Sequence, residues 1–284
     1  MGASEFHEEN EYKIWITGSN SSPQLKGEVR SSSSCVGGVI GRIENKNCKE
    51  LHVDGWYNNL NVVCTHSSAA CDDVVAYGGI VGARIDEGYA IYIGYCANFG
   101  SIGSGAVTSS GGIAGYVKEN VYIGECYNTG TIDGFYYLGG IMGRVAKGTS
   151  ISNCYNAGEV LKKSNNANHY VGGILGIKGS KDDISKGEVS IENCYNVGVS
   201  GYGIASGVNK NSWKKKYKYT NCYYVETACE NDYKNDGKKK SVDEMRRQST
   251  YNGFDNGAWG FSTTEQHAPY LIRTNAVLQQ PLKK

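Results

Sequence analysis

A chain of 284 residues that carries 39 glycines and only 3 prolines has about twice the usual share of glycine, which favours tight turns between closely spaced strands over a disordered linker. The formal net charge is +1, so the overall charge does not indicate binding to nucleic acid. The sequence contains no run of about 18 apolar residues, so we expect no membrane insertion.

The first 35 residues are predicted to form a leader and an N-terminal capping strand. The opening residues 1–6 resemble an added leader. Residues 11–17 alternate between polar and apolar side chains, which predicts the first strand, and residues 18–23 predict a turn.

A sequence motif of Gly-Gly followed by Ile or Val recurs through residues 36–225. Successive copies start 41, 33, 28, 33 and 30 residues apart. They start at Gly37, Gly78, Gly111, Gly139 and Gly172, with a degenerate copy at Tyr202. A period of this length indicates a stack of one repeated unit. We therefore predict an all-β fold, a parallel β-solenoid of about six coils with a short C-terminal cap that contains one helix.

The second half of each repeat contains a cysteine followed by tyrosine and asparagine, as in Cys154, Tyr155 and Asn156, and it recurs around Cys96, Cys126, Cys194 and Cys222. Strand alternation places the cysteine and the asparagine on one face and the tyrosine on the other. We expect the stacked asparagines to form an amide ladder inside the coil, and the tyrosines to point outward. An isoleucine three residues before the cysteine breaks the alternation, which predicts a corner between them.

The position that follows Gly-Gly-Ile in each repeat is apolar, like the isoleucine before it. It is occupied by Ile40, Val81, Ala114, Met142, Leu175 and Ala205. Alternation would place this slot on the opposite face from the isoleucine. We therefore expect either cover by the chain's own insertions or termini, or an apolar stripe that binds a partner or supports self-association.

Ten cysteines raise the question of disulfides. Five of them share one slot of the repeat, where parallel Cβ directions do not suit a bridge, so we expect a buried, reduced column. The other five are Cys35, Cys48, Cys64, Cys71 and Cys229. A bridge among these five is the alternative that would indicate an oxidising, extracellular setting.

Residues 226–284 are predicted to form a basic loop and a C-terminal cap. The stretch 209–247 holds 11 Lys or Arg residues against 6 acidic ones. Ser241 to Glu244 match a capping box, which predicts a short helix ending near Gln248. The bulky residues in 253–271 could then plug the open end of the stack.

The combination of Gly-Gly-Ile-Val-Gly at 78–82 with Asn-Cys-Tyr-Asn at 153–156 and 193–196 resembles the GLUG-type repeats of bacterial surface and secreted proteins. Residues 241–273 are similar to the segment that closes such repeats, and the likeness covers roughly residues 36–273. These repeats occur in adhesin-like proteins and beside catalytic domains such as immunoglobulin-cleaving metallopeptidases. The resemblance therefore implies a β-solenoid that is extracellular or displayed at the cell surface.

No pattern of residues predicts a cofactor. A zinc peptidase needs His-Glu-x-x-His, and residues 7–10 match only its first two positions. The segment 64–71 contains two cysteines and a histidine, for which a soft-metal cluster competes with a plain loop or a disulfide. Glu125 and Glu192 are candidates for a polysaccharide-cleaving pair, against a solvated acidic face.

Two surface features are candidate binding sites. The outward tyrosine column would either stack on sugar rings or a protein partner, or only stabilise its sheet. A basic and aromatic stretch continuing to residues 238–240 would either bind an anionic glycan, teichoic polymer or nucleic acid, or form a solvated loop. The candidate residues are Tyr127, Tyr155, Tyr195, Tyr223, Trp213, Lys214, Lys215, Lys216 and Tyr217.

Together these features favour a non-catalytic adhesion or ligand-binding module of a bacterial surface protein, with a host glycan, mucin or a protein such as immunoglobulin as its partner. A structural spacer or stalk that carries another domain is one alternative. A polysaccharide-degrading enzyme on a β-helix scaffold is the other.

Overall fold

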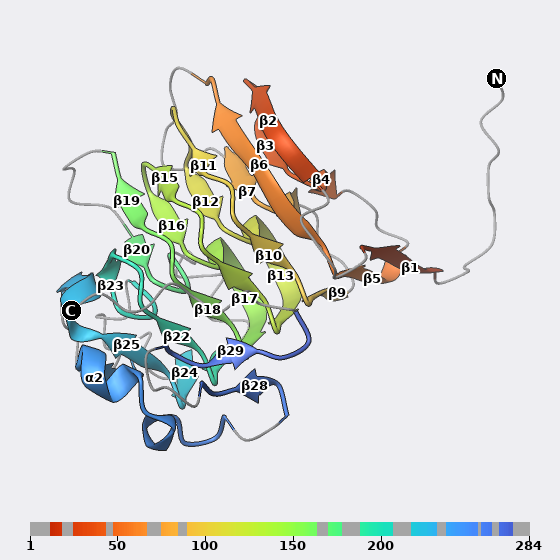
Figure 1. Cartoon of the computed structure of the whole chain (residues 1–284). Coiled ribbons are helices and arrows are strands. Elements are labelled where there is room, and N and C mark those ends of the chain that lie inside the picture. The colour runs from red at the N-terminus through yellow and green to blue at the C-terminus, as the bar shows by residue number, and fades with distance from the viewer. Residues whose placement is uncertain are drawn as a thin grey trace, which may run out of the picture.

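The computed structural model describes residues 12–18, 25–43, 48–66, 75–84, 90–163, 170–177, 188–206, 217–231, 237–254, 257–262 and 267–274. The described chain winds into a stack of coils whose strands form three parallel sheets, which we name A, B and C (Figure 1). The predicted all-β parallel solenoid is confirmed.

Each coil contributes strands to the three sheets in turn. Sheet A contains, along its path, β1 (Tyr12–Thr17), β5 (Cys48–Asp54), β9 (Ala90–Gly94), β13 (Ala114–Gly124), β17 (Met142–Ser152), β21 (Val189–Glu192) and β24 (Tyr217–Thr220), with β4 (Ile40–Ile43) and β8 (Val81–Arg84) beside it. Sheet B contains β2 (Leu25–Ser31), β6 (Tyr57–Cys64), β10 (Ala97–Asn98), β11 (Ile102–Gly103), β14 (Tyr127–Asn128), β15 (Ile132–Gly134), β18 (Tyr155–Asn156), β19 (Val160–Lys162), β22 (Tyr195–Asn196), β25 (Tyr223–Val225) and β27 (Lys238–Lys240). Sheet C contains β3 (Cys35–Gly37), β7 (Ala76–Gly78), β12 (Ser109–Gly111), β16 (Tyr137–Gly139), β20 (Tyr170–Gly172), β23 (Ser200–Tyr202) and β26 (Cys229–Asn231).

The chain then leaves the stack and forms what we call the C-terminal strap, residues 241–254, 257–262 and 267–274. The strap contains α2 (Val242–Met245), the 3-10 turn η2 (Gln248–Thr250) and the antiparallel pair β28 (Trp259–Gly260) and β29 (Tyr270–Leu271). A further 3-10 turn, η1 (Glu226–Ala228), follows β25. The predicted capping box is confirmed, since the Glu244 N–H donates to Ser241 Oγ at 3.2 Å and the Ser241 N–H donates to Glu244 Oε2 at 2.9 Å. The helix ends at Met245, three residues before the predicted end.

A sharp corner joins sheet A to sheet B at the predicted place. The residue before each cysteine of the repeat adopts the left-handed conformation, with φ between 50° and 55°. These corner residues are Tyr95, Glu125, Asn153, Asn193 and Asn221. Asparagine accepts this conformation more readily than most side chains, which explains its recurrence there.

An amide ladder runs through the middle of the stack, as the sequence predicts. Each asparagine donates from Nδ2 to Oδ1 of the next, with distances of 2.7 to 2.8 Å. The rungs are Asn58, Asn98, Asn128, Asn156 and Asn196. The second glycine of each Gly-Gly pair packs on a rung, because a Cβ at Gly140 would lie 2.2 Å from Cγ of Asn156. The repeat therefore couples its two halves by direct contact.

The ladder separates two apolar cores. One core lies between sheet A and the cysteine column, and the other lies between sheet C and the second strands of sheet B. Cys96, Cys126, Cys154 and Cys194 are fully buried thiols whose S–H groups donate to carbonyl oxygens, as from Cys154 to Ser152 at 3.2 Å. The predicted reduced column is confirmed for these four. Cys64 is also a buried thiol, whereas the side chains of Cys48 and Cys71 lie outside the described residues.

Candidate functional site

The predicted tyrosine column lies on the outer side of sheet B, but it is buried. Tyr127, Tyr155, Tyr195 and Tyr223 are each 2% exposed or less. Their rings stack along the solenoid, with centroids 4.9 Å apart for Tyr127 and Tyr155. The expectation that this column is open to a ligand is therefore wrong, because another part of the chain covers it.

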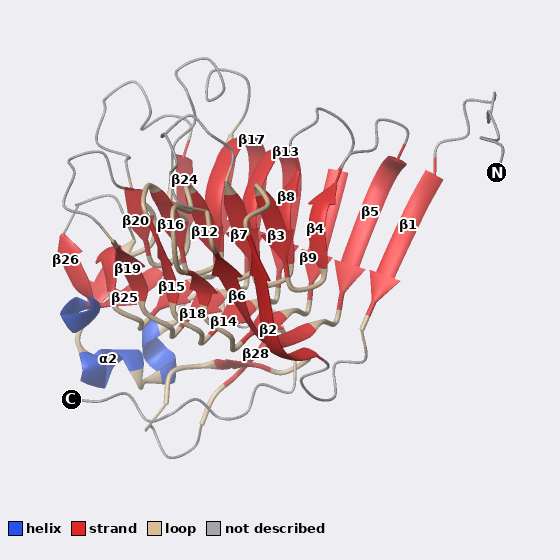
Figure 2. Ribbon diagram, turned by 90° about the horizontal axis from the view of Figure 1, so that it is seen from above, coloured by secondary structure: helices blue, strands red, loops and turns tan. Residues whose placement is uncertain are grey.

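The covering segment is the C-terminal strap, which runs along the side of the stack over sheet B (Figures 1 and 2). The Trp259 ring centroid lies 5.5 Å from that of Tyr195, and the Tyr195 hydroxyl donates to the Pro269 carbonyl at 2.5 Å. Trp259 Nε1 also donates to Oδ1 of the corner residue Asn153 at 3.2 Å. The predicted plug of the open end is thus a lateral cover that buries the tyrosines.

The basic and aromatic stretch is only partly described. Trp213, Lys214, Lys215 and Lys216 lie outside the described residues. Tyr217 begins β24 and is buried in the core beside sheet A, so its predicted place on the surface is wrong. Residues 238–240 form β27, which pairs with β25 at the end of sheet B.

The apolar stripe faces the interior. Val81, Ala114, Met142, Leu175 and Ala205 are buried in the same core as the isoleucines that precede them. The reason is a corner, since Gly140 and Ile141 form the bend between β16 of sheet C and β17 of sheet A, and the N–H groups of Ile141 and Met142 both donate to the Ile174 carbonyl at 3.0 Å. Strand alternation does not continue through a bend, so the side chains of Ile141 and Met142 both enter the same core. The coil itself covers this stripe.

A second aromatic column, not predicted from the sequence, lies on the outer face of sheet A. Trp15, His52, Tyr92 and Tyr122 occupy one register position on β1, β5, β9 and β13. Their ring centroids are 5.1, 4.7 and 4.9 Å apart, and neighbouring planes diverge by 11° to 13°. Trp15 is 58% exposed and Tyr122 is 46% exposed. This column is open to solvent where the tyrosine column is not.

The column ends abruptly after Tyr122. The same register position holds Ser150 on β17, Ser190 on β21 and Lys218 on β24. A ring inside the column has neighbours on both faces, whereas Tyr122 has the ring of Tyr92 on one side and the short Ser150 on the other. One aromatic face is thereby left beside a row of hydroxyl groups, an arrangement we call the Tyr122 step.

The next register position beside the column is partly bare backbone. Gly94 and Gly124 lie there on β9 and β13, followed by Ser152 on β17 and Glu192 on β21. A Cβ at Gly124 would meet Ser152 Oγ only at 3.7 Å, so the sheet is low there, whereas the Asp54 carboxylate lies over Gly94. The Tyr122 step is therefore flanked by a shallow shelf that can approach a flat ligand closely.

Charged groups cluster at the N-terminal end of the column. Glu50 accepts from Lys13 Nζ at 2.9 Å and lies 3.3 Å from Nε2 of His52. The hydrogen bonds from Lys13 and then His52 lower the pKa of Glu50, whereas burial raises the pKa of Asp54. These interactions hold His52 between the rings of Trp15 and Tyr92.

Glu125 and Glu192, the two carboxylates considered for sugar cleavage, occupy different positions of the repeat. Glu125 is a corner residue that accepts from Arg273 of the strap at 3.4 Å, and burial raises its pKa. Glu192 is exposed and lies in the last position of β21, in register with Ser152. They do not form a facing pair.

The described residues contain no cluster of three or more His, Cys, Asp or Glu side chains arranged to hold a metal ion. None of the described helices is long and apolar enough to cross a membrane. His66 lies two residues from Cys64 and donates its backbone N–H to that sulfur at 3.3 Å, while the rest of the segment that contains Cys71 lies outside the described residues.

Comparison with known proteins identifies a shared fold. No protein-family model and no curated protein matches the chain. The chain is similar to the crystal structure of a protein from Bacteroides ovatus described as a "putative immunoglobulin A1 protease". The identity is 20%, the TM-score is 0.56, and the match covers 92% of this chain and 78% of the other. At this identity the likeness shows the fold alone, and membership of the GLUG-type repeats stays a prediction.

Proposed function

We propose that this chain is a non-catalytic, extracellular binding module of a bacterial surface protein, and that it binds glycan at the Tyr122 step. The observation that carries this proposal is the ring of Tyr122, 46% exposed, at the point where a stacked aromatic column gives way to serines. An aromatic face with a few polar groups beside it is the usual composition of a site for a small, ring-shaped ligand.

A polar row lies beside the free face of Tyr122. Ser150, Ser190 and Lys218 follow Tyr122 on successive strands. With a spacing of about 4.8 Å between neighbouring strands, the row extends for about 14 Å beyond the ring. A sugar ring stacked on the free face of Tyr122 would lie beside Ser150, whose hydroxyl both donates and accepts hydrogen bonds.

Two further observations support the remaining parts of the proposal. The name of the Bacteroides ovatus neighbour refers to cleavage of an immunoglobulin, which is an extracellular substrate. The ion pair that ties Glu125 to Arg273 gives this carboxylate a role in holding the strap rather than in catalysis. If no glycan binds, the favoured function becomes that of a spacer that carries another domain.

The test is a glycan-array screen of the whole chain, followed by calorimetric titration of the best neutral oligosaccharide against variants. Tyr122→Ala removes the ring, and we expect affinity to fall by at least about fivefold, since stacking one ring contributes about 1–3 kcal/mol. Tyr122→Phe keeps the ring face and should bind nearly as well as the parent. Tyr136→Ala, at a half-buried tyrosine of the loop before β16, is the matched control. Unchanged binding by Tyr122→Ala, or no glycan bound at all, would refute the proposal.

A further inference from the structure

The N-terminal end of sheet A is an open edge. Strand β1 pairs in parallel with β5 and, within the described residues, with no other strand. It lies at the outer end of the stack, beyond β5, in both ribbon views of the chain (Figures 1 and 2). A strand in this position presents a row of unpaired N–H and C=O groups, which is a template for another strand.

The main-chain groups of β1 that face outward can be identified. The Gly18 N–H donates to the Asp54 carbonyl of β5 at 2.7 Å. Successive residues of a strand direct their N–H and C=O groups to opposite edges, so the even-numbered residues of β1 bond to β5. The N–H and C=O groups of Lys13, Trp15 and Thr17 therefore point away from the stack.

The apolar core also runs out uncovered at this end. Ile14 on β1, Leu51 on β5, Ile91 on β9 and Val121 on β13 share one inward register position. The exposed fraction of the side chain rises along this row from 0% at Val121 and 1% at Ile91 to 7% at Leu51 and 38% at Ile14. An inward isoleucine with this exposure marks a last layer of core that lacks a cover.

The aromatic column on the outer face of sheet A stops at the same strand. The Trp15 side chain is 58% exposed, and one face of its ring stacks on His52 with centroids 5.1 Å apart. Because β1 is the last strand of the sheet, no ring among the described residues lies on the other face of Trp15. The main chain, the core and the column are thus all incomplete at β1.

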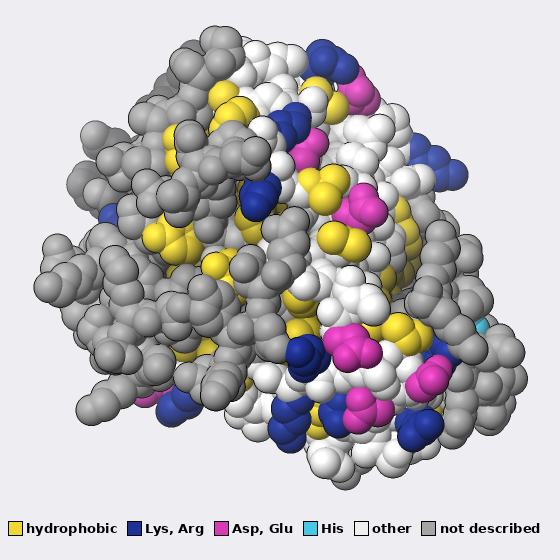
Figure 3. Space-filling view, turned by 90° about the vertical axis from the view of Figure 1, so that its left-hand side faces the viewer, with side chains coloured by type: hydrophobic (Ala, Val, Ile, Leu, Met, Phe, Trp, Pro, Cys, Tyr) yellow, Lys and Arg dark blue, Asp and Glu magenta, His cyan; other side chains and the backbone are white. Residues whose placement is uncertain are grey.

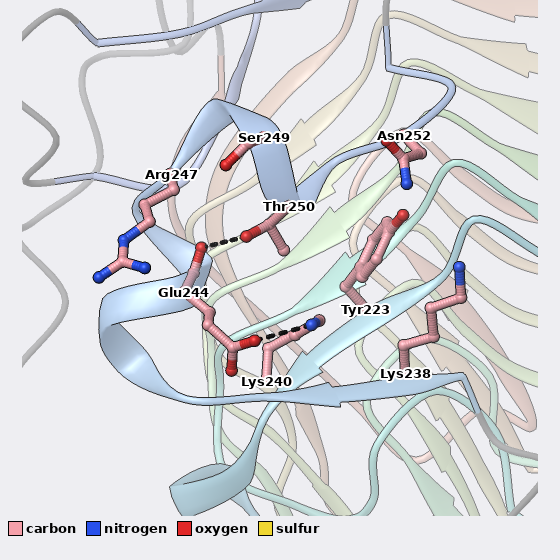
Figure 4. Close-up of a pocket in the computed structure, with 8 residues that line it drawn as sticks. All are labelled: Tyr223, Lys238, Lys240, Glu244, Arg247, Ser249, Thr250 and Asn252. Atoms are coloured by element: carbon pink, nitrogen blue, oxygen red, sulfur yellow. Dashed lines mark hydrogen bonds and ion pairs between the residues drawn. The ribbon is translucent and has the colours of Figure 1, made fainter.

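The other end of the stack is protected against pairing with another chain. Sheet B ends there at β27, which consists of three lysines, and lysines on an edge strand oppose such pairing. On the described part of this side, acidic and basic side chains are interspersed and hydrophobic ones form separate spots (Figure 3). Lys240 of β27 also donates to Glu244 of α2 at 2.8 Å, which lowers the pKa of Glu244 to about 2 and ties the strand to the strap (Figure 4).

The sequence of β1 is self-complementary about Trp15. When two copies of β1 lie antiparallel with Trp15 opposite Trp15, Ile14 lies opposite Ile16 and Lys13 lies opposite Thr17. The outward main-chain groups of Lys13, Trp15 and Thr17 then face one another as hydrogen-bonded pairs. No like charges meet, because Lys13 is the one charged residue of the strand, and its ammonium group already pairs with Glu50 at 2.9 Å.

We propose that two copies of this chain associate head to head through β1, so that sheet A continues across the contact as one sheet. The two-fold axis passes beside Trp15 and stands perpendicular to the sheet, which makes the contact closed and limits the assembly to a dimer. The two Trp15 rings join the aromatic columns of the two copies and cover the exposed end of each core. Both Tyr122 rings then lie on the same face, seven strand spacings or about 34 Å apart. The dimer does not depend on the function proposed for the Tyr122 step.

The test is sedimentation velocity of the whole chain between about 1 and 100 μM, where mass action shifts a reversible association. We expect the 30.7 kDa monomer to convert to a dimer as concentration rises. Trp15→Lys removes the ring pair and places two ammonium groups opposite each other, so association should weaken by at least about tenfold. Val199→Lys is the matched control, because it adds the same charge at another exposed apolar residue, which is 44% exposed and lies between β22 and β23.

Two further measurements separate this contact from any other dimer. Amide hydrogen exchange of residues 12–18 should slow at high concentration in the parent chain and not in Trp15→Lys. Thr17→Glu places a carboxylate opposite Lys13 of the second copy and should strengthen association, whereas Thr17→Lys should weaken it. A chain that stays monomeric at about 100 μM would overturn the proposal. A dimer that survives Trp15→Lys, or that does not distinguish Thr17→Glu from Thr17→Lys, would also overturn it. Circular dichroism checks that each variant is folded.

Discussion

Removing one rung of the amide ladder should be far more costly than its small size suggests. Asn128 lies in the middle of the ladder and is fully buried. Its Nδ2 donates to Asn156 Oδ1 and to the Gly130 carbonyl, both at 2.8 Å. Its Oδ1 accepts from Asn98 Nδ2 at 2.7 Å and from the Gly130 N–H at 3.2 Å. Asn128→Ala therefore deletes four hydrogen bonds at once.

The magnitude follows from those four bonds. A net loss of about 0.5–1.5 kcal/mol for each gives about 2–6 kcal/mol in total. The upper half of that range is the expected result, because the partners left behind are buried and water does not replace the amide. A loss of this size is a large fraction of the total stability of about 5–15 kcal/mol that is usual for a folded domain.

The measurement is urea unfolding followed by circular dichroism, with Thr129→Ala as the control, since Thr129 is the adjacent residue and its side chain is exposed. In a stacked array the loss should also be local, so amide hydrogen exchange should accelerate most in the coils next to Asn128. If Asn128→Ala lowers the unfolding free energy by less than about 1 kcal/mol, or by no more than Thr129→Ala, the ladder is not what holds the coils together.

Three further results are expected. Burial raises the pKa of Cys126 well above its usual value, so its thiol should resist iodoacetamide at pH 8 in the native chain and react fully in urea, as mass spectrometry would show. Gly140→Ala should unfold at much lower urea than the parent because its Cβ would overlap Asn156, whereas Gly41→Ala, whose nearest contact is 3.3 Å away, should lose little. The pKa of Glu244 is lowered from 4.5 to about 2, so the stability that its carboxylate gives the strap is complete above pH 4.5 and is lost as pH falls toward 2. Tryptophan fluorescence followed during acid titration should show this loss in the parent chain and not in Glu244→Gln.

The interior of the coil could be predicted from the sequence because two constraints agree there. Strand alternation fixes the relative direction of Cys154, Tyr155 and Asn156, and the repeat places the same residues on neighbouring strands. An inward asparagine in such a stack needs partners, and the next asparagine supplies them. The corner, the ladder and the reduced cysteines follow from these local arguments alone.

The covered tyrosine column could not be predicted in this way. Alternation gives the side of the sheet on which Tyr155 lies, but not which distant segment packs there. Trp259 is 106 residues from Asn153 in sequence. Its contacts with Asn153 and Tyr195 depend on the path of the whole strap. The prediction for the apolar position at Met142 was wrong for a different reason, because Met142 directly follows the corner between sheets C and A, where strand alternation does not hold.

Two features could have been found with a different alignment of the repeats. Residues 56–58 fill the Cys-Tyr-Asn positions of the first coil with Trp, Tyr and Asn, so the first rung, Asn58, was hidden by the change at the cysteine. The residues of the sheet A column each stand between two apolar residues ahead of a corner, as Tyr122 does between Val121 and Ile123. The column mixes Trp, His and Tyr, so only their shared position reveals it.

The break in the sheet A column is what makes a binding face, and it can be moved. The two aromatic columns differ because the tyrosine column is covered by the strap, whereas the sheet A column stays open and stops at Ser150. Ser150→Tyr should extend the stack over Tyr122, raise stability by about 0.5–1 kcal/mol through the new ring pair, and abolish glycan binding at the Tyr122 step. Ser150→Ala keeps the step open and should bind within a few-fold of the parent. Thermal unfolding and the same glycan titration measure both effects. Full binding by Ser150→Tyr would mean that the free ring face is not the site.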